Sequence, residues 1–148
     1  MLLKTRRGRC GEAANLFTCF ARSLSFESRL IYDPSDHLWT EIYSKKRQQW
    51  IHCDPCENLF DSPLIYEQGW NKSIEFCIAF AKDHIEDVTW RYVQQFQLTI
   101  QRRNIHENNF RYFIHSINKF ILSKINLNQR IFIIQRFFLF FSFLLLLN

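Results

Sequence analysis

The stretch DHLWTEIYSKKRQQWIHCD, residues 36–54, decides the fold of this 148-residue chain. Polar and apolar side chains alternate from Asp36 to Tyr43 and again from Gln49 to Asp54, and the polar segment Ser44 to Arg47 separates the two. Alternation with a period of two is typical of strands whose two faces meet different surroundings. The pattern therefore predicts an antiparallel hairpin.

A tight turn with Ser44 opposite Arg47 would set the register of this hairpin. The resulting cross-strand pairs are His37 with Asp54, Trp39 with His52, and Glu41 with Trp50. Directly opposed side chains have Cβ atoms about 4.5–5.5 Å apart, so an imidazole and a carboxylate in such positions can form a hydrogen bond. The opposite face carries Leu38, Ile42, Ile51 and Cys53. We expect a His–Asp pair on one face and a packing surface on the other.

The segments around the hairpin predict one helix and further strands. Within residues 11–24, four apolar side chains share one face at a period of 3.6, which predicts a buried helix of about 13 residues: Leu16, Phe17, Phe20 and Leu24. Residues 28–32, 74–81 and 88–92 are candidates for strands. One helix followed by an antiparallel meander is an α+β arrangement.

Cys10 immediately precedes the expected helix. Unpaired N–H groups and the positive end of the helix dipole favour the thiolate there, and Arg6, Arg7 and Arg9 add positive potential. A thiolate is a nucleophile, but efficient amide hydrolysis also needs a base and a group that orients the base. His37 and Asp54 supply both if the start of the helix packs against the hairpin.

A Cys at a helix start, a His on one strand and an Asp on the next is similar to the order in transglutaminase-like and papain-like thiol enzymes. More specifically, the chain over about residues 4–92 resembles the core of the cytoplasmic peptide:N-glycanases, the peptide-N4-(N-acetyl-β-glucosaminyl)asparagine amidases. Five segments carry the resemblance: TRRGRCGEAANLFT, SDHLWTEIYS, WIHCDPCEN, YEQGW and DVTWRY. It implies a transglutaminase-like (papain-like) α+β core in which Cys10, His37 and Asp54 form the catalytic triad.

The resemblance also implies a reaction. A thiol amidase of this family hydrolyses the amide between an N-glycan and asparagine in misfolded glycoproteins and leaves aspartate. Four further residues are implied to support activity: Arg29, Trp39, Glu41 and Trp50. The two indoles offer flat faces for a sugar or for the wall of the cleft, and Glu41 can pair with Arg29. Proteasome-shuttle and ER-associated degradation proteins are the implied partners, and the cytoplasm, with the nucleus as a second compartment, is the implied location.

Two departures from the family pattern suggest an alternative. Ala13 stands where the family usually has Trp, and the zinc-binding CxxC pairs, the helices and the oxyanion-hole Trp that precede the catalytic Cys in the family are not found in the nine residues before Cys10. The sequence therefore looks like an N-terminally truncated catalytic-core fragment, for which we expect no cofactor and no metal. The alternative function is an inactive transglutaminase-like module that binds protein partners or denatured glycoproteins.

Composition and charge divide the chain into three parts. Residues 1–92 form the expected catalytic core, residues 93–128 a basic helical extension, and residues 129–148 an apolar low-complexity tail. Residues 1–93 carry 12 Lys and Arg against 13 Asp and Glu, whereas residues 94–148 carry 7 against 1. The core therefore has no basic excess, and nucleic acid is not an expected partner. Five apolar residues of the extension recur at the spacing of a helix, which predicts that it is helical: Phe110, Phe113, Ile114, Ile117 and Ile121.

The remaining expectations concern cysteines, tryptophans and the tail. The odd number of cysteines, five, and the lack of a signal peptide favour reduced thiols over disulfides. We expect the side chains of Cys53, Trp70 and Trp90 to lie in the core. His52 is expected to have a structural role. The apolar run of the tail is too short to span a bilayer. A helix packed on the domain, a membrane-surface segment and a translated intron remain open for it, and a tail without selected function is favoured.

Overall fold

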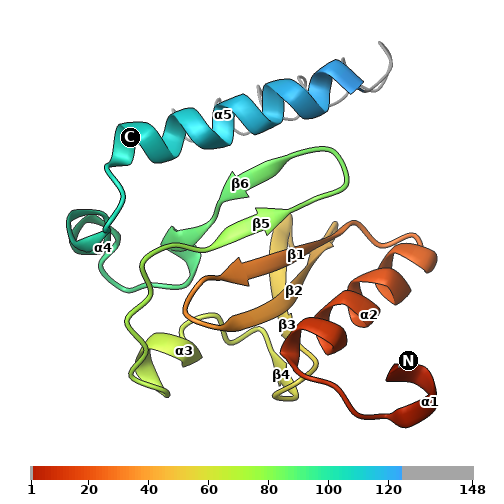
Figure 1. Cartoon of the computed structure of the whole chain (residues 1–148). Helices are drawn as coiled ribbons and strands as arrows, with labels where there is room; N and C mark the ends of the chain where they lie inside the picture. Colours follow the sequence, from red (N-terminus) through yellow and green to blue (C-terminus); the bar gives the residue numbers. More distant parts are fainter. Residues whose placement is uncertain (1, 125–148) are drawn as a thin grey trace.

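Six antiparallel strands form one sheet in the computed structural model, which describes residues 2–124 (Figure 1). The sheet order is β4-β3-β2-β1-β5-β6. The strands are β1 (Ser28–Asp33), β2 (His37–Ser44), β3 (Gln49–Asp54), β4 (Leu59–Phe60), β5 (Ile78–Phe80) and β6 (Ile85–Asp87). The helices are α1 (Leu2–Thr5), α2 (Cys10–Ser23), α3 (Ile65–Gln68), α4 (Phe96–Arg102) and α5 (Glu107–Lys124), with a 3₁₀ turn η1 (Thr89–Arg91). These elements confirm the α+β class.

The predicted elements of the first half agree closely with the structure. The strand over Gln49–Asp54 has the predicted bounds, and the helix begins at Cys10. The prediction of a strand over residues 88–92 is wrong, because Thr89–Arg91 form a 3₁₀ turn. Strands β4 and β6, of two and three residues, are too short to produce an alternation that a sequence pattern reveals.

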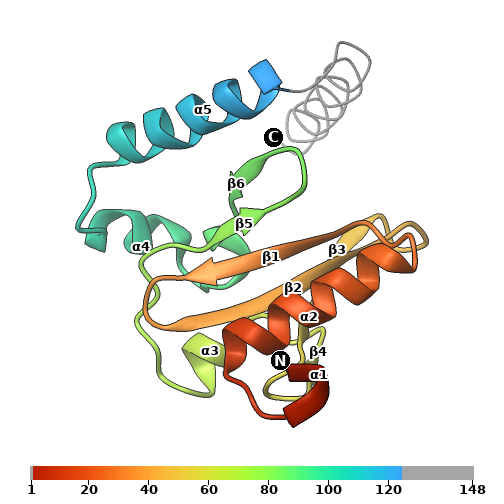
Figure 2. The ribbon, with the colours of Figure 1, turned by 45° about the vertical axis from the view of Figure 1, so that its right-hand side comes forward.

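The buried face of α2 differs from the predicted one. Figures 1 and 2 show α2 lying along one face of the sheet, over β1 and β2. Its buried residues are small, namely Ala14, Thr18 and Ala21, whereas Phe20 is 47% and Leu24 71% exposed. Small side chains let the helix approach the sheet closely, and hydroxyls link the two elements: Thr18 and Thr40 are 2.8 Å apart, and Thr40 donates to the Ala14 carbonyl.

The register of the β2–β3 hairpin is also corrected. Four residues, 45–48, connect the strands, so Ser44 pairs with Gln49, and the ladder continues with Glu41 opposite His52. Gln48 adopts a φ of 54°, the left-handed conformation that closes such a longer loop. The predicted pairs are wrong by two residues. Because side chains alternate with a period of two, this shift leaves every residue on its predicted face.

Both faces of the hairpin are packed, which corrects the expectation of a single packing surface. Leu38 and Thr40 lie beneath α2, and the opposite face carries the main core. There the Trp39 ring stacks on Tyr66 with centroids 4.4 Å apart. The cluster consists of Ile31, Trp39, Tyr66, Ile74, Cys77, Ala79, Val88, Tyr92 and Val93.

Helix α5 packs along the β5–β6 edge of the sheet (Figure 2). Phe110 is buried against Ile78 and Ile85, and Ile114, Ile117 and Ile121 pack beside it. Phe113, which the sequence pattern placed on the same face, is 51% exposed. Helix α5 covers residues 107–124 of the extension predicted over residues 93–128, whereas the expectations for residues 129–148 lie outside the described part. Among the described residues, no helix has the length and apolar character needed to cross a membrane.

Candidate active site

The thiol of Cys10 lies at the first residue of α2, where the helix dipole is most positive. Glu12 caps this end, since its carboxylate accepts the Arg9 N–H at 2.9 Å, and that backbone hydrogen bond lowers the pKa of Glu12. A Cβ atom placed on Gly11 would contact Leu38 Cδ1 at 3.9 Å. The start of α2 therefore packs against the start of β2, the strand that begins with His37, and Cys10 is half-buried.

His37 and Asp54 form the hydrogen-bonded pair that the sequence predicts. His37 Nε2 lies 2.6 Å from Asp54 Oδ2, and both residues are buried, at 6% and 1% exposure. Burial alone would raise the pKa of Asp54, but hydrogen bonds from His37 and Tyr66 outweigh it, so the pKa is below its ordinary value. An ionised carboxylate only accepts hydrogen bonds, so His37 Nε2 carries the proton and Nδ1 remains for the reacting groups.

Asp54 is held by more than His37. Its Oδ1 accepts the backbone N–H groups of Cys56 at 3.0 Å and Glu57 at 3.2 Å, and its Oδ2 accepts the Tyr66 hydroxyl at 2.8 Å. Tyr66 lies on α3, twelve residues along the chain, and is a residue that reasoning from the sequence did not select. Its presence in the YEQGW segment is a signal, but only the fold brings α3 beneath Asp54.

Aromatic rings surround His37 on the side of the main core. Trp39 is fully buried, 5.6 Å from the His37 ring, so it lines the site and offers no face to a sugar. Trp70 is 43% exposed, and its ring meets His37 edge to face at 5.3 Å. The expectation that Trp70 is a core residue is therefore wrong, as it is for Trp90, which is 49% exposed. The exposed indole beside the imidazole is Trp70.

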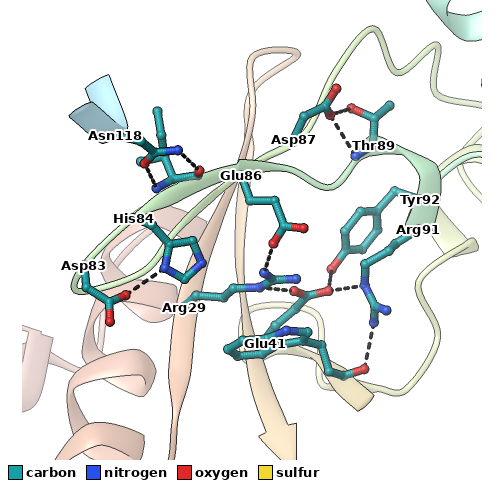
Figure 3. A network of polar contacts seen from close by, with 12 residues as sticks. Arg29, Glu41, Asp83, His84, Glu86, Asp87, Thr89, Arg91, Tyr92 and Asn118 are labelled. Carbon is teal, nitrogen blue, oxygen red and sulfur yellow. Dashed lines mark hydrogen bonds and ion pairs between the residues drawn. The ribbon is translucent and has the colours of Figure 1, made fainter. Parts of the chain in front are cut away.

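The other predicted supporting residues brace the sheet (Figure 3). Glu41 is buried and accepts Arg29 Nε at 2.6 Å, Arg91 Nε at 2.7 Å and the Tyr92 hydroxyl at 2.7 Å, and Arg29 also contacts Glu86. Burial opposes ionisation of Glu41, but Arg29 and Arg91 overcome it and the pKa of Glu41 falls below its usual value. The predicted Arg29–Glu41 pair is confirmed. It links β1, β2, β6 and η1.

Trp50 belongs to this brace. The Arg29 guanidinium lies 4.0 Å above its ring, and its carbonyl accepts Arg91 Nη2 at 2.7 Å. Trp50 precedes Asp54 by four residues of β3, about 13 Å along an extended strand. One face of this indole is therefore covered by Arg29, and the contacts of Trp50 hold the sheet together.

The two cysteines beside Asp54 differ in environment. Cys53 is buried, as predicted, and burial raises its thiol pKa to about 11, so it stays protonated. Cys56 is exposed. Within residues 2–124, no group of three or more His, Cys, Asp or Glu side chains is arranged to hold a metal ion.

The comparisons with known proteins agree with this fold. The model of the Rad4 transglutaminase-like domain matches residues 32–130, and that of the transglutaminase-like superfamily matches residues 1–55. The chain is 52% identical to the peptide-N(4)-(N-acetyl-beta-glucosaminyl)asparagine amidase of Gallus gallus, with 80% of this chain and 18% of the relative aligned.

Relatives of the same name come from distant organisms. The protein of Homo sapiens is 46% identical over 91% of this chain and 21% of its own length, and that of Arabidopsis thaliana is 48% identical over 70% and 14%. The chain thus spans about a fifth of the length of the first of these relatives. Because the model of the Rad4 transglutaminase-like domain covers residues 32–130, more than half of the chain, the chain belongs to the Rad4 transglutaminase-like domain family.

Proposed function

We propose that this chain is the catalytic core of a thiol amidase that removes N-linked glycans from glycoproteins. The observation that carries the proposal is the buried pair of His37 and Asp54, 2.6 Å apart, at the end of the sheet where α2 begins with Cys10. The amidase name of relatives 46–52% identical to the chain supports the same reaction. Cys10, His37 and Asp54 are the proposed catalytic residues.

The first half of the reaction forms a thioester. The Cys10 thiolate attacks the side-chain carbonyl carbon of the glycosylated asparagine, and the carbonyl oxygen takes up the negative charge. When the C–N bond breaks, the His37 imidazolium gives its Nδ1 proton to the departing glycosylamine. Asp54 accepts a hydrogen bond from the Nε2–H of His37 throughout, which leaves Nδ1 directed at the reacting atoms.

The second half releases the peptide. His37, now neutral at Nδ1, takes a proton from water while the water oxygen attacks the thioester carbon. The C–S bond breaks, the thiolate of Cys10 returns, and the peptide leaves with aspartate in place of asparagine. The same imidazole thus acts as acid and then as base, and no proton is left over.

The sugar would lie against Trp70. This indole is exposed and meets the His37 ring, so a glycan attached to the reacting asparagine passes beside it. Trp39 and Tyr66 close the inner side of the site and keep bulk water from the His37–Asp54 pair. Trp70 is therefore the side chain we assign to the first sugar.

The substrates and compartment follow from the same proposal. All five cysteines are free thiols, which suits a reducing compartment such as the cytosol or nucleus. Misfolded glycoproteins are the proposed substrates there, and proteasome-shuttle and ER-associated degradation proteins the proposed partners. No cofactor is proposed for the reaction, since thiol, imidazole and carboxylate supply every proton transfer.

Glycan release from denatured ribonuclease B tests the proposal. The purified chain is expected to release the glycan and to leave aspartate at the glycosylation site, both visible by mass spectrometry. Cys10→Ala is expected to abolish release, whereas Cys19→Ala, which removes an exposed thiol from the same helix, is expected to leave it unchanged. A folded wild-type chain that releases no more glycan than Cys10→Ala would overturn the proposal.

A further inference from the structure

A series of buried hydrogen bonds runs from Asp54 through Tyr66 to His52. Tyr66 Oη lies 2.8 Å from Asp54 Oδ2, His52 Nε2 lies 2.6 Å from Tyr66 Oη, and the Ser62 N–H lies 3.3 Å from His52 Nδ1. His52 and Tyr66 are both fully buried. Neither residue takes part in the proton transfers of the proposed mechanism.

Each proton in this series of hydrogen bonds has one possible position. The Ser62 N–H is a backbone donor, so His52 Nδ1 must accept and Nε2 must carry the proton of the neutral ring. His52 Nε2–H then donates to Tyr66 Oη, whose own proton points to Asp54. Burial lowers the pKa of His52 to about 4, which keeps the ring neutral and this direction fixed.

The direction of these hydrogen bonds determines how the Asp54 carboxylate is held. With Tyr66 and His37 both donating to Oδ2, and the Cys56 and Glu57 N–H groups donating to Oδ1, each carboxylate oxygen has two donors. Such a carboxylate has no free lone pair for a proton, and any rotation of the carboxylate group would break hydrogen bonds to its donors. It therefore presents a fixed acceptor to His37 Nε2.

We infer that Tyr66 is a positioning residue for the catalytic pair, and that His52, anchored by the Ser62 N–H, orients the Tyr66 hydroxyl toward Asp54. Through Asp54, this relay selects the His37 tautomer with the proton on Nε2. The inference rests on the proposed function for its effect on rate. Its effect on the His37 tautomer is a property of the folded chain alone.

Tyr66→Phe is the first test, since it removes the hydroxyl and keeps the ring that stacks on Trp39. The matched control is Tyr92→Phe, which removes an equally buried hydroxyl from the same core, where it serves Glu41 and not Asp54. Long-range ¹H–¹⁵N correlation spectra of the full chain report the tautomer of His37 without any substrate. We expect Nε2–H in the wild type and in Tyr92→Phe, and a mixture of tautomers in Tyr66→Phe.

His52 offers a rescue experiment. His52→Leu leaves Tyr66 without its donor, whereas His52→Gln retains an N–H group near the position of Nε2. We expect His52→Leu to reproduce the Tyr66→Phe spectrum and His52→Gln to restore much of the wild-type signal. In glycan release, Tyr66→Phe is expected to lower kcat about tenfold with little change in KM, well short of the roughly 10⁴-fold loss when a triad carboxylate is replaced.

The outcomes separate the two proposals. An unchanged His37 tautomer in folded Tyr66→Phe overturns the inference, whether or not the chain is an amidase. Equal changes in Tyr66→Phe and Tyr92→Phe also overturn it, because they show a general loss of core packing. If the wild type releases no glycan but the tautomer shifts as expected, the amidase proposal fails and the positioning role stands.

Discussion

The imidazole of His37 and the carboxylate of Asp54 meet at 2.6 Å, although the two residues are not opposite each other in the β2–β3 ladder. Extending the observed register by one pair places Trp39 opposite Asp54, so His37 is a diagonal neighbour. Diagonal neighbours lie about 7–8 Å apart, with their Cβ atoms somewhat closer, a gap that a long planar side chain can close. Trp39, the residue directly opposite Asp54, forms the inner wall of the site.

Asp54→Asn is expected to lower kcat for glycan release by about 10⁴-fold, because an amide in this position no longer enforces the Nε2–H tautomer of His37. The measurement is release from a denatured glycoprotein at saturating substrate. Asp61→Asn, in the exposed pair with Arg47, is the control and is expected to retain full activity. Equal activity in wild type and Asp54→Asn would contradict the assigned role.

Trp70→Ala is expected to raise KM about tenfold while kcat changes little, which corresponds to a loss of about 1.4 kcal/mol of binding energy. The physical reason is the loss of an exposed indole that lies against His37, where the sugar is expected to pass. Trp90→Ala removes an indole of similar exposure from η1 and serves as the control. A lower kcat at constant KM would instead assign Trp70 to the chemical step.

Glu41→Gln is expected to lower the free energy of unfolding by about 3 kcal/mol, because it leaves Arg29 and Arg91 without their buried counter-charge. Urea unfolding followed by tryptophan fluorescence measures the loss. The comparison is again Asp61→Asn, whose exposed ion pair is expected to contribute less than about 1 kcal/mol. Equal losses for the two variants would show that the network in Figure 3 adds little.

His52 is expected to make the fold sensitive to mild acid. Its pKa is about 4 in the folded chain, lowered from 6.5 chiefly by burial. Below pH 6.5 the unfolded chain binds the proton that the folded chain refuses, so the free energy of unfolding falls as the pH drops from 6.5 to about 4. Between pH 7 and pH 5 the expected loss is about 2 kcal/mol.

Urea unfolding at these two pH values, for the wild type and His52→Gln, measures this dependence. The variant has no imidazole at this position and is expected to lose much less stability over the same interval. His115→Gln, on the exposed side of α5, is the control and is expected to behave like the wild type. A wild type with equal stability at pH 7 and pH 5 would exclude a buried neutral His52.

Sequence alone determined helix α2, strands β1 to β3 and the face on which each hairpin residue lies. Period-two alternation defines a face without defining a partner, so it placed His37, Asp54, Trp39 and His52 on one side even with the register wrong by two residues. The position of Cys10 at a helix start was equally local, since it follows from where the helical pattern begins. Neither the face of a hairpin residue nor the start of the helix depends on a correct prediction of the length of the turn.

Tertiary structure decided everything that depends on which surfaces meet. The sequence pattern of α2 pointed to its large apolar residues as the buried face, but the sheet accepted Ala14 and Thr18, because close helix–sheet packing selects small side chains. Tyr66 reaches Asp54 from a helix of four residues, and Trp70, two residues beyond that helix, stands exposed beside His37. No periodicity in so short an element encodes its docking, so the groups that hold and flank the catalytic pair are set by the packing of α3 against the sheet.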